Sequence, residues 1–350
     1  MQSNETESRD VLDDAPIFTI PAGTGERWLR SDRARLASLM TPDQGRYLVD
    51  LYYQIQEFRK ALGNQRGTLE KAHEPHQVLD WGFGEMGYLE VRIRQLMETY
   101  TDVEPTGMGR WAKGQVGVGP VLSAGLLIYI DITQAPTVGH IWRLFGLDPT
   151  RVWHSRKDAD RIVAETMDGN RYVDADQLAE IGRRADRNVM FLEKWGAVYS
   201  KSPTGRLTPD AVAKAVARRP FNMSAKVLCY KLGESFVKVS NNPDAFFGHI
   251  YKERKCLEQE RNLEGRFAAQ AAEILRTKTI GKDTEAYKWY ADGKLPPAHI
   301  HARARRVAVK IFLSCWHEEA YRRYYHREPP LPYPLAKLPG HTHKISAPEA

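Results

Sequence analysis

The sequence predicts an all-α fold. Over most of the chain, apolar residues recur at intervals of three and four, the spacing that places them on one face of a helix. No segment shows the strict alternation of apolar and polar residues that is typical of a strand. The combination Thr-Pro-Asp, a signal for the start of a helix, occurs at Thr41 and again at Thr208. We therefore expect a long antiparallel helical hairpin followed by a region of shorter helices.

Composition shifts and turn residues divide the chain into successive segments. Segment boundaries are placed where proline, glycine or runs of charge interrupt the helical pattern. The predicted segments are 1–40 (largely disordered or extended), 41–104 (antiparallel helical hairpin, similar to a coiled coil), 105–150 (helix-hairpin-helix region), 151–220 (charged insertion), 221–328 (helical part with a basic helix) and 329–350 (proline-rich tail).

The hairpin of residues 41–104 is predicted from two long apolar stripes. The first helix begins at Pro42, and we expect Gly63 and Gly67 to end it. A second apolar stripe runs over residues 75–100. Because only a short polar link separates the two stripes, the helices are expected to pack antiparallel.

Residues 105–150 carry the most informative motif. Val116-Gly117-Val118-Gly119-Pro120 has the form of a helix-hairpin-helix, in which two glycines permit a tight turn and leave no Cβ between backbone and ligand. Pro120 suits the first turn of the next helix, whose unbonded N–H groups bind anions. Trp111 and Lys113, just before the hairpin, add a stacking surface and one charge. A DNA phosphate fits such a site without conveying sequence information.

The same motif has a plainer interpretation. It is also consistent with a glycine-rich turn between helices whose packing face consists of the small residues Ser123, Ala124 and Gly125. A nucleotide-binding loop is not expected, because no strand precedes the glycines and neither a Gly-Lys-Ser/Thr sequence nor a third glycine follows.

Several of these residues resemble a known family. The run Val116–Pro120, the helix Ala124-Gly125-Leu126-Leu127, Asp131-Ile132 and the stretch Trp142–Pro149 together resemble the C-terminal domain of the insertion-sequence family 110 transposases, grouped with families 116 and 902. The helical hairpin at 41–104 resembles the coiled coil that precedes this domain. The resemblance implies a DNA-binding transposase domain, a serine nucleophile and a homo-oligomer, since such proteins act as dimers or tetramers.

The chain departs from the family pattern in two respects. The family's RuvC-like nuclease domain has no counterpart, because residues 1–41 are too short and show no strand pattern. The family's serine follows the Gly-Leu-x-Pro sequence and precedes a glycine. Here Ser155 has approximately that spacing, but Arg156 replaces the glycine. Ser155 is the catalytic candidate, with Arg151, His154 and Arg156 as cations for the phosphate; the alternative is a surface serine in a basic loop.

Two further helices are predicted in the second half of the chain. Residues 174–195 and residues 243–277 each carry a pattern long enough for one uninterrupted helix.

The helix that starts near residue 298 carries a basic face. His299, Arg303, Arg306 and Lys310 follow spacings of four, three and four, so they share one side of the helix. This row would extend along ~16 Å at 1.5 Å per residue, which suits a phosphate backbone. The alternative is a solvated face balanced by acids of the long helix, namely Glu258, Glu260 or Glu264.

No metal site is predicted. His299 and His301 are two residues apart and do not face together on a helix, and no cysteine or carboxylate lies nearby at ligand spacing. The alternative is that the segment before Ala302 is extended, in which case both imidazoles could reach one ion. No cofactor is expected either. Only a nuclease would require Mg²⁺, and Asp131, Asp148 and Asp158 have no spacing that indicates one.

Composition limits the class of protein. The formal net charge of +7 suits a nucleic-acid partner, and a hydrophobic fraction of 42% excludes disorder of the whole chain. Three distant cysteines indicate no disulfide framework, and no apolar run is long enough to span a membrane. We therefore expect a cytoplasmic protein without a membrane partner.

The sequence thus predicts a DNA-binding protein related to the transposase domain and taking part in transposition or recombination, with RNA as an alternative ligand. The competing hypothesis is a non-catalytic scaffold or interaction protein of a phage or mobile element. The predicted DNA contacts are Lys113, Val116, Gly117, Val118, Gly119, Arg151, Arg156, His299, Arg303, Arg306 and Lys310.

Overall fold

The computed structural model describes residues 30–150, 153–167, 169–200, 205–338 and 344–348. Within these ranges every regular element is a helix, so the prediction of an all-α fold is confirmed. None of these described helices is both long enough and apolar enough to cross a membrane. In chain order the elements are α1 (Arg30–Leu39), α2 (Pro42–Lys71), α3 (Gln77–Val103), α4 (Met108–Gly114), α5 (Pro120–Tyr129), the 3₁₀ turn η1 (Ile132–Gln134), α6 (Val138–Leu144), α7 (Arg156–Ala164), α8 (Ala175–Ala185), α9 (Val189–Ser200), α10 (Pro209–Ala217), α11 (Met223–Lys238), α12 (Phe246–Leu263), α13 (Ala268–Thr277), α14 (Glu285–Ala291), α15 (Pro297–Tyr325) and α16 (Tyr333–Lys337).

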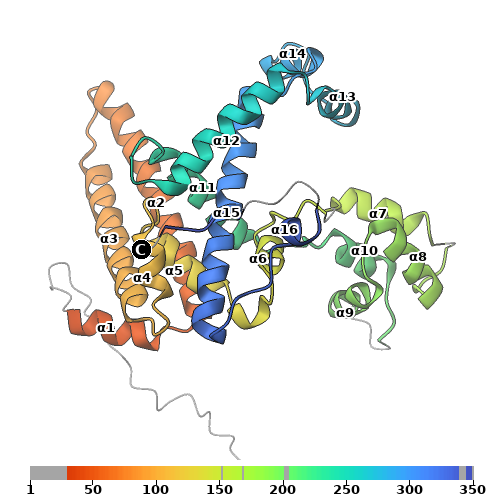
Figure 1. The fold of residues 1–350 in the computed structure, drawn as a ribbon, viewed down its shortest axis with the longest axis horizontal. Helices are drawn as coiled ribbons and strands as arrows, with labels where there is room; N and C mark the ends of the chain where they lie inside the picture. The colour runs from red at the N-terminus through yellow and green to blue at the C-terminus, as the bar shows by residue number, and fades with distance from the viewer. Residues whose placement is uncertain (1–29, 151–152, 168, 201–204, 339–343, 349–350) are drawn as a thin grey trace, which may run out of the picture.

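The two longest N-terminal helices, α2 and α3, lie side by side at one edge of the molecule (Figure 1). Thr41 and Gln44 form a capping box at the start of α2. The Thr41 hydroxyl accepts a hydrogen bond from the N–H of Gln44, and the Gln44 side chain accepts one from the N–H of Thr41. Arg59 pairs with Glu90 at 2.6 Å and Arg66 with Asp80 at 3.1 Å. Because later positions in α2 meet earlier positions in α3, the two helices run antiparallel.

The predicted end of the first helix was wrong. Gly63 and Gly67 lie inside α2, which continues to Lys71. A Cβ added to Gly63 would lie 3.1 Å from the ring of Phe83, so this glycine permits the close approach of α3. A glycine in a helix interior costs about 1 kcal/mol relative to alanine, which the packing of two long helices outweighs.

The larger hydrophobic core is formed by α2, α3 and α5 together with α11, α12 and α15. At its centre Phe236, Phe247 and Phe312 come from α11, α12 and α15, and their ring centroids are separated by 5.1 to 5.4 Å. All three side chains are at most 1% exposed. The long helix α15 packs on α11 and α12 at this aromatic centre and also contacts α4 and α6.

A second, smaller core is formed by α7, α8, α9 and α10 and shares no buried residue with the first. Figure 1 shows these helices together, to one side of the rest of the molecule. The chain segments that lead into and out of this group lie next to each other. The indole N–H of Trp153 donates to the carbonyl of Ala217 at 3.2 Å, and the N–H of Asn222 donates to the carbonyl of Leu144 at 3.0 Å.

Both long helices predicted in the second half of the chain are interrupted. Asp186 has a left-handed backbone (φ 49°) and separates α8 from α9, while Gly265 (φ 75°) lies between α12 and α13. The Asn262 side chain then exchanges two hydrogen bonds with the backbone of Leu295, at 2.8 and 2.9 Å. The chain thus folds back after α12, so that α15 packs along α12.

Candidate nucleic-acid interface

The hairpin between α4 and α5 holds its two glycines in different environments. Gly117 has a positive φ of 98°, its carbonyl accepts a hydrogen bond from the Ser235 hydroxyl at 2.5 Å, and an added Cβ would lie 3.1 Å from Val239. Gly119 is exposed, with an extended backbone (φ −82°), and an added Cβ would have no neighbour within 4 Å. Gly117 is therefore needed by the fold, whereas Gly119 borders solvent.

The start of α5 retains the features of an anion site. Pro120 occupies the first turn, no side chain caps the helix, and the first backbone hydrogen bond runs from Ser123 N–H to the Gly119 carbonyl at 3.0 Å. The N–H groups of the first turn consequently have no acceptor inside the helix. The valines beside the glycines do not enlarge this surface, because Val118 is 4% exposed and Val116 is half-buried.

The side chains expected to support the hairpin are occupied elsewhere. The Lys113 ammonium pairs with Asp102 at 2.5 Å. Trp111 is 8% exposed and stacks on Phe312, with ring centroids 6.2 Å apart, so it belongs to the core. The expectation that Trp111 offers a stacking surface to a ligand is therefore wrong.

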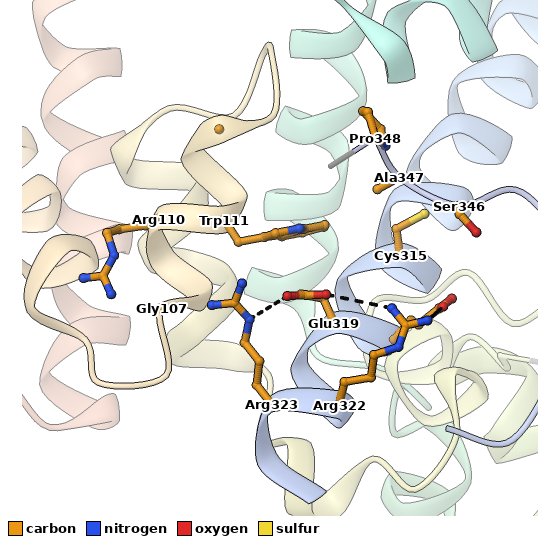
Figure 2. A pocket seen from close by; sticks show the side chains of 12 residues that line it. Gly107, Arg110, Trp111, Cys315, Glu319, Arg322, Arg323, Ser346, Ala347 and Pro348 are labelled. Atoms are coloured by element: carbon orange, nitrogen blue, oxygen red, sulfur yellow. Dashed lines mark hydrogen bonds and ion pairs between the residues drawn. The ribbon is translucent and has the colours of Figure 1, made fainter. Parts of the chain in front are cut away.

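The cavity next to the hairpin is large, about 760 Å³, but its arginines are already bonded within the protein. Figure 2 shows the Glu319 carboxylate between Arg323 and Arg322 from α15, at 2.6 and 3.9 Å. Arg323 also donates to the Thr106 carbonyl at 2.9 Å. Arg110 on α4 donates to the backbone carbonyl of Asp102 at 2.5 Å. Anion binding here would have to break existing pairs.

At the start of α7, too, the polar side chains expected to bind a phosphate are already bonded to other groups of the protein. The Ser155 hydroxyl accepts from the N–H of Asp158 at 3.1 Å and donates to its carboxylate at 2.6 Å, so Ser155 is the helix cap. The hydrogen bond from Ser155 lowers the pKa of Asp158. Arg156 bonds to Asp160 at 2.8 Å and to Asp210 at 2.7 Å.

Among the described residues, the group bonded to the Ser155 hydroxyl is the Asp158 carboxylate, and the adjacent cation Arg156 is already paired with carboxylates. The Nε2–H of His154 donates to the carbonyl of Ala185 at 2.8 Å. Arg151 lies outside the described residues. Ser155 caps α7, and this helix lies with the smaller core, well away from α4 and α5 in Figure 1.

The basic face of α15 divides into two halves. His299 bonds to the Tyr290 hydroxyl at 3.2 Å, and burial, with Arg303 and Arg306 nearby, lowers its pKa. Arg303 donates to the fully buried Glu258 at 2.8 Å. These first two positions therefore serve the fold, and the alternative of neutralisation by Glu258 is correct for Arg303.

The other two positions of the row, Arg306 and Lys310, are not held by ion pairs to any described residue, although the Asp148 carboxylate acts on the Lys310 ammonium from a longer distance and opposes the lowering of its pKa. Neither forms an ion pair within 4.0 Å among the described residues. Burial and the charges of Arg303 and Arg305 lower the pKa of Arg306, although its side chain reaches solvent. Burial also lowers the pKa of Lys310, and its ammonium lies 5.0 Å from the centre of the Trp142 ring.

Arg306 and Lys310 line a cavity of about 460 Å³, which we call the basic cavity. Its cations come from two helices, and the segment Gly146–Pro149 closes one side. The charged residues of its wall are four cations and two carboxylates, namely Arg254, Arg303, Arg306, Lys310, Asp148 and Glu258. The basic face of α15 thus meets the Gly-Leu-Asp-Pro segment of the motif at Trp142–Pro149.

The sequence did not indicate that Arg254 belongs to this site. Arg254 lies one helical turn before Glu258 on α12 and pairs with it, so the buried carboxylate holds Arg254 and Arg303 together. The sequence shows the spacing of four between Arg254 and Glu258, but it does not show that α12 packs on α15.

Comparisons with known proteins give no further guidance. No family model matches the chain, and neither the curated proteins nor the solved structures contain a match. The similarity to the insertion-sequence family 110 transposases therefore stays a hypothesis. The described residues contain no group of three or more histidine, cysteine or carboxylate side chains arranged for a metal. His299 and His301 bond to different tyrosines, Tyr290 and Tyr251.

Proposed function

We propose that this protein binds DNA through backbone phosphates, with the basic cavity as the main contact and the start of α5 as a second. The observation that carries the proposal is the pair Arg306 and Lys310, two cations in one concave wall that form no ion pair within 4.0 Å with any described residue. Cations that are not paired with a carboxylate are the groups that replace counterions on a phosphate backbone.

The geometry suits a charged strand. Arg306 and Lys310 are four positions apart on α15, which separates them by ~6 Å along the helix axis. The half-buried walls around them lower the local dielectric, so a phosphate interacts with these cations more strongly than with cations in bulk water. The net charge of +7 supports attraction of a polyanion at long range.

The proposal concerns binding rather than strand transfer through Ser155. The Ser155 hydroxyl is bonded to Asp158, and its neighbour Arg156 is bonded to two carboxylates. The Asp158 carboxylate can accept the hydroxyl proton, but activation of a serine also requires cations available to the phosphate, and Arg156 is used by Asp160 and Asp210. A role in transposition rests on the family resemblance alone.

The test is the salt dependence of DNA binding. We would measure the affinity of the full chain for a labelled duplex by fluorescence anisotropy at several salt concentrations. The variant Arg306→Gln/Lys310→Gln is expected to weaken binding for every sequence and to reduce the slope of log affinity against log salt by about 2, since each phosphate contact contributes about 1.

Arg276→Gln is the matched control. Arg276 is 72% exposed on α13 and paired with Glu273, so its loss should leave affinity and slope unchanged. A wild-type affinity that does not respond to salt, or no binding at low salt, would overturn the proposal and favour a scaffold or interaction protein.

A further inference from the structure

A second cavity adjoins the basic cavity. It has a volume of about 440 Å³ and lies under the proline-rich segment that follows α15, and we call it the apolar chamber. Arg254, Val307 and Lys310 line both spaces, so the cationic end and the apolar end meet at these three side chains. The apolar wall of the chamber includes Val138, Trp142, Ile311, Leu331, Pro334 and Leu335, and the paired side chains of Glu318 and Lys344 also line it.

Trp142 is held in a fixed orientation at the junction. Its indole N–H donates to the carbonyl of Lys310 at 3.3 Å, while the Lys310 ammonium lies 5.0 Å from the ring centre. An aromatic ring fixed beside an ammonium group offers a surface for a planar ring and a charge for an attached anion.

Two polar groups in the chamber wall can bond to a planar heterocycle. The Nε2–H of His317 donates to the carbonyl of Ala135 at 2.8 Å, and burial lowers the pKa of His317, so its Nδ1 is left as an acceptor. The Ser314 hydroxyl donates to the Lys310 carbonyl at 2.8 Å and keeps its oxygen lone pairs available.

We propose that the two cavities together bind one unpaired nucleotide, with its phosphate at Arg306 and Lys310 and its base in the apolar chamber beside Trp142. Each volume falls in the range of about 300–1,000 Å³ that is usual for ligand pockets. A base taken out of the stack needs an apolar, partly aromatic pocket with a few hydrogen-bonding groups, which this chamber provides. The inference rests on the proposed function, because the nucleotide that occupies the two cavities is an unpaired nucleotide of the bound DNA.

The experiment compares a blunt duplex with the same duplex carrying one unpaired thymidine, and includes thymidine monophosphate as a free nucleotide. The wild type is expected to bind the duplex with the unpaired thymidine about tenfold more tightly, which corresponds to about 1.4 kcal/mol. Ser314→Leu, which narrows the chamber, should abolish this preference and leave the affinity for the blunt duplex unchanged. Ile311→Phe should have the same effect by a different side chain.

Ser38→Leu is the matched control for Ser314→Leu. Ser38 is exposed on α1 and its hydroxyl likewise bonds to a carbonyl of the preceding turn, so this change should preserve the preference. Thermal melting of each variant identifies any that fails to fold. The two duplexes can be compared as long as one of the variants Ser314→Leu and Ile311→Phe folds.

The outcomes separate the two proposals. Equal wild-type affinity for both duplexes, or a preference that survives in folded Ser314→Leu and Ile311→Phe, would overturn the nucleotide site while DNA binding stands. Binding of thymidine monophosphate without binding of either duplex would support the site with a free nucleotide as its ligand and overturn the proposed function. Binding of none of the three would overturn both.

Discussion

The start of α7 and the basic cavity are two charge clusters built on the same plan, with opposite accessibility. In each, one carboxylate bridges two cations: Asp210 holds Arg156 and Lys214 at 2.7 and 2.8 Å, and Glu258 holds two arginines of the basic cavity. The Asp210 side chain is 60% exposed, whereas that of Glu258 is completely buried.

The difference lies in whether the predicted phosphate contacts remain available. At the start of α7 the predicted contact Arg156 is bonded to both Asp160 and Asp210. In the basic cavity Glu258 is used by Arg254 and Arg303, and two further cations stay without an ion pair among the described residues. A basic cluster is therefore informative about ligands only after its carboxylates have been assigned.

The largest expected effect comes from neutralising the two bridging carboxylates. Glu258→Gln should lower the free energy of unfolding by about 3 kcal/mol, because it leaves two partly buried guanidinium groups without their buried partner. Asp210→Asn should cost less than about 1 kcal/mol, since exposed ion pairs are weak. Urea denaturation of both variants measures the difference. Equal costs would contradict the contrast between a buried and an exposed bridge.

The hairpin glycines give the next largest effect and extend the comparison to the second proposed contact. Gly117→Ala should destabilise the protein by about 2 kcal/mol, since an alanine at φ 98° is strained and its Cβ would lie 3.1 Å from Val239. Gly119→Ala should change stability by no more than about 0.5 kcal/mol, because its φ is ordinary and nothing is within 4 Å.

Only Gly119→Ala is therefore a clean test of phosphate binding at α5. It places a methyl group at the start of the helix without disturbing the fold, so we expect a weaker affinity for DNA at unchanged melting temperature. If DNA affinity is unaffected in Gly119→Ala, the hairpin is a turn between helices, and binding is confined to the basic cavity.

Much of the fold could be predicted from local signals. The capping residues Thr41 and Thr208 begin α2 and α10 as expected, because a cap depends only on its own and the next few residues. The errors concern helix ends. Gly63 did not end α2, since packing on Phe83 outweighs its poor propensity, whereas Gly265 did interrupt the predicted long helix between residues 243 and 277.

The site was less predictable, because charges were readable and their partners were not. The row of four on α15 was visible at helical spacing, but its division into bonded and unbonded halves depends on α12 and α14, which supply Glu258 and Tyr290. The apolar chamber required the proline-rich segment to fold back over α15, and no local pattern in the sequence indicates that contact.

A smaller effect is expected at Ser155. Ser155→Ala removes the cap of α7 and should lower stability by about 1 kcal/mol. Affinity for DNA should be unchanged, in contrast to Arg306→Gln/Lys310→Gln. Melting temperature and anisotropy measured on the same preparations test both statements. A covalent DNA adduct that forms in the wild type and is lost in Ser155→Ala would contradict the structural role and support the transposase resemblance.

The smallest effect is a dependence of stability on pH centred on α15. Burial lowers the pKa of His317, although its bond to the Ala135 carbonyl and the nearby Glu318 act in the opposite direction. Between this lowered pKa and about 6.5 the unfolded chain binds more protons than the folded one, so stability decreases as pH falls through that interval.

The variant His317→Gln tests this dependence, because glutamine keeps a donor for the Ala135 carbonyl and cannot titrate. The loss of stability between about pH 7 and pH 5 should therefore be smaller in His317→Gln than in the wild type, without vanishing, because burial also lowers the pKa of His299 and His301. Urea denaturation at several pH values measures this slope, and an identical slope in His317→Gln would show that His317 is not a source of the acid sensitivity.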